Sequence, residues 1–186
     1  MKRPTLLLIT GPNGAGKTTF AAEFLTHEMK GTRFVNADEI ARGLSPFDPA
    51  SVAFKAGRIL IEECRDLTER KVDFALESTL SGRGHASTIR NAKAAGYQVV
   101  LHFLWLASPE ESIRRVKQRV KKGGHHVPDV DIQRRYPRIM RNLIEVYLPL
   151  SDRWYIWNSA GPRFIPLANS LNHSILTVEE FLKRND

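Results

Sequence analysis

A glycine-rich segment behind a short apolar run constrains this chain more than any other feature of its sequence. Residues 5–10 read TLLLIT, and residues 11–20 read GPNGAGKTTF. From Gly11 to Thr18 the chain matches G-x-x-x-x-G-K-[ST], a pattern in which glycines let successive backbone N–H groups point inward at an anion. The apolar run is typical of a strand, and the apolar spacing after the loop is typical of a helix. The sequence therefore predicts a strand, a phosphate-binding loop and a helix, in that order.

The residue types within this loop have distinct chemical tasks. We expect Lys17 to reach the β- and γ-phosphates of ATP and the Thr18 hydroxyl to bind Mg²⁺. A glycine-rich turn without a ligand is the alternative, and the match at every fixed position of the pattern disfavours it. The residues predicted to contact the nucleotide are Gly11, Pro12, Asn13, Gly14, Ala15, Gly16, Lys17, Thr18 and Thr19.

Strand-like and helical segments alternate along the rest of the sequence. The strand-like runs are residues 5–10, 33–37, 73–77, 97–106 and 154–158, and the helical stretches are residues 17–29, 50–70, 86–95, 109–122 and 131–151. This alternation predicts an α/β fold with a parallel sheet and helices on both faces. Together with the phosphate-binding loop it favours the P-loop NTPase fold, for which we expect a five-stranded parallel sheet in the order 2-3-1-4-5. A chain of 186 residues is expected to form a single domain over residues 1–186.

The basic residues are concentrated in one segment. The chain has 28 Lys and Arg against 20 Asp and Glu, a net charge of +8. Residues 113–141 contain ten of the basic residues and two acids, Asp129 and Asp131, so this segment accounts for the whole excess. Two arginine-lined helical stretches flank a Gly-Gly turn here, which predicts a basic, LID-like flap over about residues 109–141.

The arginines of this flap are candidates for catalysis. Phosphoryl transfer spreads negative charge over the γ-phosphate oxygens, and arginines brought over them stabilise that charge. Closure of the flap would also exclude water from the reaction. Arg115 and Arg119 are four residues apart and share one helix face. A solvated helical hairpin or a nucleic-acid-binding patch is the alternative reading of the same charges.

Polar side chains follow the second and third predicted strands, at the edge of the sheet where ligands bind. Asp38 is either the N-cap of a helix or a carboxylate facing the γ-phosphate, where it could accept a proton or hold Mg²⁺ through water. Glu77 ends the third strand and could serve Mg²⁺ or a substrate hydroxyl, with the Thr79 hydroxyl beside it. Arg83 lies in a Gly-rich loop that could close over an acceptor. Ordinary turn chemistry is the alternative for the residues after the third strand.

Together these motifs resemble the zeta-toxin family of small P-loop kinases. The segments that carry the resemblance are GPNGAGKTT at 11–19, FVNADEIARGLSP at 34–46, FALESTLSGRGH at 74–85, RVKKGGHHVPDVDIQRRYPRIMRNL at 119–143 and WYIWNSAG at 154–161. The resemblance implies a kinase that phosphorylates a sugar hydroxyl, since the best-known members act on UDP-N-acetylglucosamine. It also implies a possible antitoxin partner.

The resemblance assigns roles to particular residues. It implies that Asp38 is the general base and that Glu77 and Thr79 contact the acceptor. It further implies that flap arginines surround the triphosphate, namely Arg119 with one of Arg134 or Arg135. One position departs from the toxin pattern, because Ser81 stands two residues after the threonine where the toxins have arginine, and the arginine here comes at Arg83.

These features favour an ATP-dependent small-molecule kinase that transfers the γ-phosphate to a hydroxyl of a sugar, a nucleotide sugar or a related metabolite. A polynucleotide kinase and a non-catalytic ATP-binding switch are the alternatives. Nucleic acid is disfavoured because Tyr136 is the only aromatic residue in the basic segment, which leaves no stacking platform for bases.

No apolar stretch reaches the roughly 18–20 residues of a membrane span. The single cysteine, Cys64, excludes an internal disulfide, and we expect a cytoplasmic protein.

Overall fold

The computed structural model describes residues 3–27 and 31–184. Its strands are β1 (Thr5–Thr10), β2 (Arg33–Val35), β3 (Phe74–Ser78), β4 (Gln98–Trp105), β5 (Arg153–Asn158) and β6 (Ile165–Asn169). Its α-helices are α1 (Lys17–His27), α2 (Ala37–Leu44), α3 (Ala53–Glu69), α4 (His85–Ala94), α5 (Pro109–Lys121), α6 (Asp129–Asn142), α7 (Leu148–Leu150) and α8 (Ile175–Arg184). A 3₁₀ turn, η1 (Pro49–Val52), precedes α3, and a π-helical turn, η2 (Leu143–Tyr147), joins α6 to α7.

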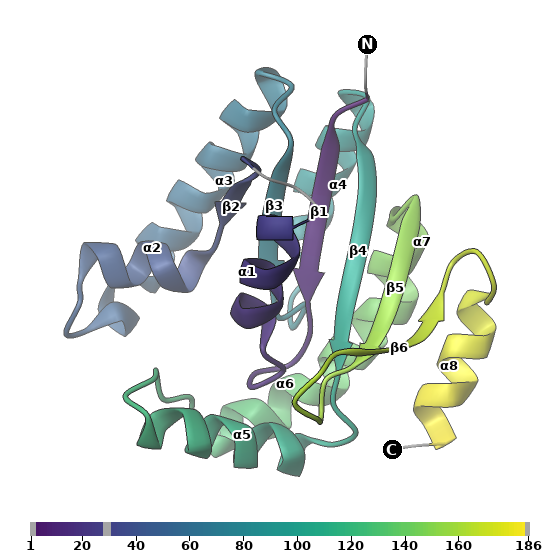
Figure 1. Ribbon diagram of the computed structural model, residues 1–186. Coiled ribbons are helices and arrows are strands. Elements are labelled where there is room, and N and C mark those ends of the chain that lie inside the picture. The colour runs from purple at the N-terminus through teal and green to yellow at the C-terminus, as the bar shows by residue number, and fades with distance from the viewer. Residues whose placement is uncertain (1–2, 28–30, 185–186) are drawn as a thin grey trace.

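The sheet confirms the predicted parallel order and adds one strand. Within the described residues the order is β2-β3-β1-β4-β5-β6 (Figure 1), and the first five strands are parallel. The prediction of five strands was wrong at one edge, where β6 pairs antiparallel with β5. Strand β6 contains Pro166, which cannot donate to a sheet ladder and is tolerated only at an edge. Its short sequence, IPLAN, also lacks the long apolar run that marks β1 and β4.

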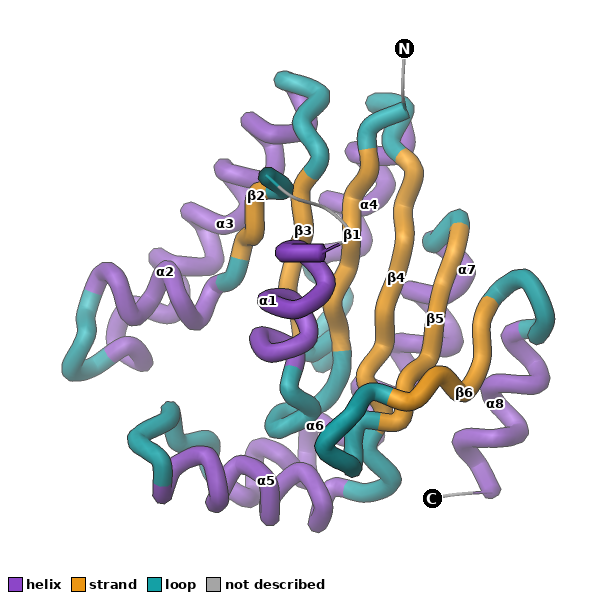
Figure 2. Tube along the Cα trace, viewed as in Figure 1, coloured by secondary structure: helices purple, strands orange, loops and turns teal. Residues whose placement is uncertain are grey.

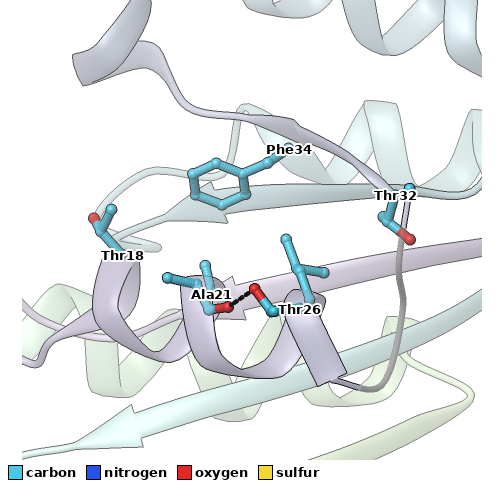
Figure 3. Close-up of a pocket in the computed structure, with 8 residues that line it drawn as sticks. Thr18, Ala21, Thr26, Thr32 and Phe34 are labelled. Atoms are coloured by element: carbon cyan, nitrogen blue, oxygen red, sulfur yellow. Dashed lines mark hydrogen bonds between the residues drawn. The ribbon is translucent and has the colours of Figure 1, made fainter.

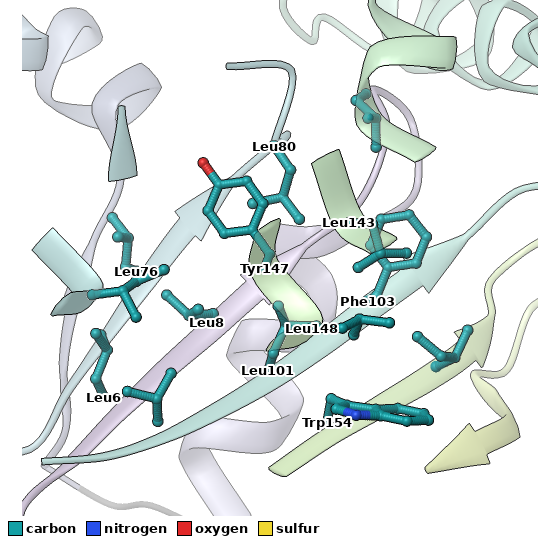
Figure 4. Close-up of a cluster of buried hydrophobic side chains, with 14 of the residues drawn as sticks. Leu6, Leu8, Leu76, Leu80, Leu101, Phe103, Leu143, Tyr147, Leu148 and Trp154 are labelled. Carbon is teal, nitrogen blue, oxygen red and sulfur yellow. The ribbon is translucent and has the colours of Figure 1, made fainter. Parts of the chain in front are cut away.

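Strand β1 shows why the central strands are apolar throughout. Leu6 and Leu8 belong to the larger core cluster (Figure 4), to which α3, α4 and α6 contribute side chains. Leu7 and Ile9 point to the opposite face, into the cluster beneath α1. Side chains alternate between the faces of a strand, so a strand with helices on both sides is buried on both sides. The alternating helices of the sequence therefore produce the three layers seen in Figure 1.

Two helix predictions need correction. The cap of α2 is Asn36 rather than Asp38, because the Asn36 side chain accepts hydrogen bonds from the N–H groups of Asp38 and Glu39 at 2.8 and 3.3 Å. The predicted helix at 131–151 is interrupted, since α6 ends at Asn142 and the π-helical turn follows. The predicted helix at 17–29 is present up to its residue 27, and positions 28 and 29 lie outside the described residues.

The fold brings the ends of separate strands to one edge. Figure 2 shows the loops after β1, β3 and β4 gathering at the carboxyl edge of the sheet. Helix α5 runs along this edge, beneath the loop that follows β1 (Figure 1). In the part of the chain that the structure describes, no helix combines the length and apolar character needed to cross a membrane.

A buried histidine of β4 should make the free energy of unfolding depend on pH. His102 is 4% exposed and packs against Phe20, Phe24, Tyr155 and Trp157, whose indole N–H donates to its Nδ1 at 3.1 Å. Burial lowers the pKa of His102 from 6.5 to about 4. The unfolded chain thus takes up this proton near pH 6.5, whereas the folded chain takes it up only near pH 4. The free energy of unfolding should therefore fall by about 3 kcal/mol as the pH is lowered through this interval.

Denaturant titrations of the wild-type protein and of His102→Phe at about pH 7 and about pH 4.5 would measure this contribution. The phenylalanine keeps the ring shape and cannot bind a proton. The variant should lose less stability than the wild type over this interval. Equal losses in the two proteins would contradict the assignment.

Candidate active site

The phosphate-binding loop has the geometry that its glycines predict. Residues 11–16 form the loop, and Lys17, Thr18 and Thr19 open α1. Gly11 has φ +143°, and a Cβ there would lie 2.4 Å from the carbonyl oxygen of Leu104 in β4. Any other residue at this position would be strained both by its backbone conformation and by that contact.

Lys17 lies at the base of this loop and is almost completely buried, with 8% of its surface exposed. Its Nζ donates to the carbonyl oxygen of Pro12 at 3.2 Å and lies 3.9 Å from Oε1 of Glu77. Burial lowers the pKa of Lys17, and the charges of Glu77 and Asp38 oppose this shift. The nearby carboxylates thus stabilise the charge of the Lys17 ammonium group less than water would.

Glu77 comes from the neighbouring strand. In the β1–β3 ladder it pairs with Ile9, which places its side chain next to the start of the loop. Its Oε2 accepts a hydrogen bond from the Thr18 hydroxyl at 3.0 Å. Burial raises the pKa of Glu77, while Lys17 and the Thr18 hydrogen bond lower it. Both members of the Lys17–Glu77 pair are therefore shifted toward their neutral forms, because burial outweighs their mutual attraction.

Asp38 and Arg119, on two other elements, lie close enough for their charges to act on the Lys17–Glu77 pair. Asp38 lies in the first turn of α2 and is exposed, and its charge raises the pKa of both Lys17 and Glu77. Arg119 lies in the last turn of α5. Burial lowers the pKa of Arg119, and the charges of Asp38 and Glu77 raise it. The structure thus brings together the loop lysine, two carboxylates and one flap arginine.

Arg115 is a site residue that the sequence did not identify as such. Its Nε donates to the carbonyl oxygen of Gly14 at 2.8 Å, and its Nη1 donates to the carbonyl oxygen of Ser159. Helix α5 packs closely here, since a Cβ on Gly14 would lie 3.0 Å from the carbonyl oxygen of Ser112. The sequence did show that Arg115 and Arg119, four residues apart, lie on one face of a helix. It did not show what that face contacts.

The remaining predicted arginines make other contacts. Arg134 and Arg135 both face Asp131 on their own helix, at 2.6 and 3.9 Å. Arg83 Nε donates to Oδ1 of Asn142 at 3.0 Å, and its Nη2 pairs with Glu145 at 2.5 Å. These contacts hold the three guanidinium groups to α6 and the turn after it. The predicted acceptor residue Thr79 has its hydroxyl 3.1 Å from that of Ser81.

The flap is packed at its base. A small apolar cluster joins its two arms. The cluster consists of Val116 in α5, Val127 in the segment before α6, and Ile132 in α6. Helix α6 also belongs to the main core through Ile139 and Met140. Both arms of the predicted flap therefore pack against each other, and α6 also packs into the main core. Residues 121–126, at the turn between the two arms, are mostly exposed and do not belong to this cluster.

A pocket opens beside the site, between α1 and β2 (Figure 3). Its volume is about 480 Å³, and its lining residues are Thr18, Ala21, Ala22, Leu25, Thr26, Gly31, Thr32 and Phe34. Thr18 lies at the loop end of this pocket, and the Phe34 ring extends over α1 (Figure 3). Lys17, Glu77 and Asp38 do not line it. The pocket therefore adjoins the charged cluster without containing it.

The roles of two flap arginines can be separated by substitution. If the loop binds ATP as the sequence predicts, Arg119→Gln should reduce the rate of phosphoryl transfer by about 10²–10³-fold, because the arginine expected to face the phosphates is lost. Arg134→Gln should leave the rate within about twofold, since it removes a surface ion pair worth at most about 1 kcal/mol. Comparison of the two rates with γ-labelled ATP checks this expectation. Equal losses in both variants would show that α6 also supplies a phosphate ligand.

Comparison with known proteins adds a family and a fold. The family model described as Zeta toxin matches residues 1–148 of this chain. A protein of Haemophilus influenzae, described as an uncharacterized protein, is 30% identical over 126 residues, which make up 68% of this chain and 88% of that protein.

Two solved structures resemble this chain over nearly its whole length. The structure of the PezAT chromosomal toxin-antitoxin system of Streptococcus pneumoniae superposes with a TM-score of 0.75 at 18% identity, over 98% of this chain and 78% of the other. The structure of AvrRxo1-ORF1 and -ORF2 with ATP superposes with a TM-score of 0.75 at 21% identity, over 99% of this chain and 64% of the other. At these identities the likeness shows a shared fold, the α/β fold of P-loop kinases.

Proposed function

Because the chain belongs to the zeta-toxin family, we propose that it is a P-loop kinase that transfers the γ-phosphate of ATP to a hydroxyl group of a small molecule. The observation that carries this proposal is that four side chains from four elements influence one another's charges at the end of the loop. These are Lys17, Asp38, Glu77 and Arg119. A purely nucleotide-binding switch would not need Asp38, the exposed carboxylate among them.

The state of the loop lysine supports a polyanionic ligand. The Lys17 ammonium is buried, and its ion pair with Glu77 is long, at 3.9 Å. A triphosphate bound by the loop amides would provide the negative charge that this cation lacks, as in other P-loop proteins. The positive end of α1, which begins at Lys17, adds to the attraction.

The same residues fit a magnesium ion. The Thr18 hydroxyl and the Glu77 carboxylate lie 3.0 Å apart, and oxygen atoms of this kind are the ligands that Mg²⁺ prefers. The described residues contain no group of three His, Cys, Asp or Glu side chains that could hold a metal by themselves. The ion would therefore depend on phosphate oxygens as well as on Thr18. When bound, Mg²⁺ neutralises charge on the phosphates.

Asp38 is the proposed general base. The N-cap Asn36 uses the backbone N–H of Asp38 and not its carboxylate, so the carboxylate is free to face the mouth of the site. It would accept the proton of the acceptor hydroxyl as the oxygen attacks the γ-phosphate. Arg119 would stabilise the charge on the transferring group, and Arg115 would hold α5 against the loop.

For the acceptor, we propose a nucleotide sugar such as UDP-N-acetylglucosamine, held by Glu77 and Thr79. This follows from the family and from the position of both residues at the end of β3. Ser81 in place of the toxins' arginine alters the polar groups of this loop, so the test below also includes acceptors other than UDP-N-acetylglucosamine. An antitoxin is the proposed protein partner, by analogy with the toxin-antitoxin system from which one chain superposes on this chain.

The nucleic-acid alternative receives less support. Several flap cations are paired with acids of the flap itself, among them Lys117 with Asp129 at 2.7 Å and Arg114 with Glu111 at 2.6 Å. These pairs reduce the charge that a phosphate backbone would meet.

The direct test incubates the protein with γ-labelled ATP and Mg²⁺ and two acceptor sources, UDP-N-acetylglucosamine and a small-molecule cell extract. Lys17→Met is the control for contaminating kinases. A labelled product that requires Lys17 supports the kinase. Label on UDP-N-acetylglucosamine supports the finer assignment, and label only on another metabolite replaces it. If ATP binds and no acceptor is labelled from either source, the proposed function is wrong.

A further inference from the structure

A buried asparagine at the end of α6 has no part in the chemistry proposed above. Asn142 is 5% exposed, and both ends of its amide are used. Nδ2 donates to the carbonyl oxygen of Leu80 at 2.9 Å, and Oδ1 accepts from Nε of Arg83 at 3.0 Å. Both partners lie in the loop after β3, which is separated from Asn142 by about 60 residues of sequence. One side chain thus holds two points of one loop.

The loop needs such support because of its backbone. Leu80 has φ +61°, in the left-handed region that is disfavoured for residues with a side chain. Its side chain is buried in the main core (Figure 4), and its N–H donates to Oγ of Ser78 at 3.1 Å. Without Asn142, the buried carbonyl oxygen of Leu80 would lose its hydrogen-bond donor. The left-handed backbone conformation of Leu80 would then lose a hydrogen bond that stabilises it.

The π-helical turn η2 adds two more contacts to the same loop. Glu145 pairs with Nη2 of Arg83 at 2.5 Å, and the Tyr147 hydroxyl donates to the carbonyl oxygen of Gly82 at 2.7 Å. Figure 4 shows Tyr147 and Leu80 within the same core cluster. Turns of this kind inside helices are frequently found at functional sites. Three side chains within six residues therefore grip the loop from Leu80 to Arg83.

We propose that Asn142, Glu145 and Tyr147 form a clasp that sets the position of the acceptor-binding loop. Asn142 is then a positioning residue for the acceptor and not for the nucleotide. This inference rests on the proposed function, because Glu77 and Thr79 lie directly before the clasped residues. It also changes the role of Arg83, which the clasp holds on both Asn142 and Glu145 instead of leaving it free for the acceptor.

A purely structural role for Asn142 predicts different behaviour. Loss of packing would loosen the loops after β1 and β3 alike and would weaken nucleotide and acceptor binding together. Loss of the clasp would loosen only the loop after β3 and would weaken only acceptor binding. Hydrogen exchange of the two loops therefore separates these possibilities.

The experiment compares the wild-type protein with Asn142→Leu, Tyr147→Phe and Glu145→Gln. Tyr147→Phe removes one hydroxyl, and Glu145→Gln changes a half-exposed side chain, so both test the clasp if Asn142→Leu fails to fold. The control is Gln133→Ala, which changes an exposed side chain of the same helix nine residues before Asn142. Mass spectrometry follows hydrogen exchange in residues 79–84 and 11–20. Calorimetry measures the affinity for a non-hydrolysable ATP analogue, and serial dilutions of the extract give the half-saturating acceptor dose.

We expect Asn142→Leu to speed exchange in residues 79–84 and to raise the half-saturating acceptor dose, each by about tenfold, as for loss of a bond to a buried carbonyl. Exchange in residues 11–20 and affinity for the ATP analogue should stay within about twofold. Smaller shifts of the same kind are expected for Tyr147→Phe and Glu145→Gln.

Unchanged exchange in residues 79–84 in all three variants, or equal changes in both loops, would overturn the clasp. If the wild-type protein labels no acceptor, the kinase proposal fails and the acceptor role of the clasp fails with it. The exchange comparison would then still decide whether Asn142 holds the loop.

Discussion

Replacing Asp38 by asparagine should lower the rate constant for phosphoryl transfer by about 10²–10⁴-fold and leave the affinity for an ATP analogue within about twofold. Asparagine keeps the shape of the side chain but cannot take the proton of the acceptor hydroxyl. Because Asp38 is exposed and its N–H is bound by Asn36, the variant should fold normally. Transfer from γ-labelled ATP and calorimetry with the analogue measure the two quantities separately.

The neighbouring residue provides a matched control for Asp38. Glu39 lies in the same helical turn, is exposed, and pairs with Arg42 at 3.2 Å. Glu39→Gln removes the same charge one residue away and should leave transfer within about twofold. A similar loss in both variants would assign the effect to the local charge, and an undiminished rate in Asp38→Asn would refute the general base.

Replacing Lys17 by methionine should reduce kcat/KM for ATP by about 10²–10³-fold, because the buried cation that we propose to bind the phosphates is lost. The effect should also appear in the affinity for the ATP analogue, in contrast to Asp38→Asn. Since burial lowers the pKa of Lys17, methionine should not reduce the free energy of unfolding of the nucleotide-free protein. Calorimetry and denaturant titration test the two parts.

Lys55→Met is the control for general loss of positive charge, since Lys55 is exposed on α3. It should change neither the nucleotide affinity nor the rate. If Lys17→Met binds the analogue as tightly as the wild type, then the loop does not hold the triphosphate in the proposed manner.

Much of this site could be predicted because its parts depend on local sequence. The loop from Gly11 to Thr18 needs its glycines, lysine and hydroxyl at fixed spacing, so the pattern is visible without a structure. Asp38 and Glu77 could be selected because parallel strands present their carboxyl ends at one edge. The structure brings both to Lys17 by placing β3 between β2 and β1.

The parts that could not be predicted depend on contacts between distant segments. Arg115 meets Gly14 across about 100 residues of sequence, and Asn142 meets Leu80 across about 60. Such pairs follow from packing and leave no spacing in the sequence. The N-cap of α2 is a different case, because Asn36 and Asp38 both suit a cap and the backbone conformation at Asn36 decides between them.

The flap shows the limit of an argument from charge. Ten basic residues in one segment predict an anionic ligand but do not say which of them reach it. Asp131 engages Arg134 and Arg135, whereas the charges of Asp38 and Glu77 act on Arg119, and on this ground we propose Arg119 as the arginine that faces the ligand.

The measurement that tests this account most directly is a crystal structure of the protein with Mg²⁺ and a non-hydrolysable ATP analogue. We expect the triphosphate within the amides of residues 11–18, with Lys17 Nζ at hydrogen-bond distance from it, about 2.7–3.2 Å. The Asp38 carboxylate should lie within reach of an acceptor oxygen beside the γ-phosphate, directly or through one water. A nucleotide bound elsewhere, or an Asp38 carboxylate turned away from the γ-phosphate beyond that reach, would contradict the proposed kinase.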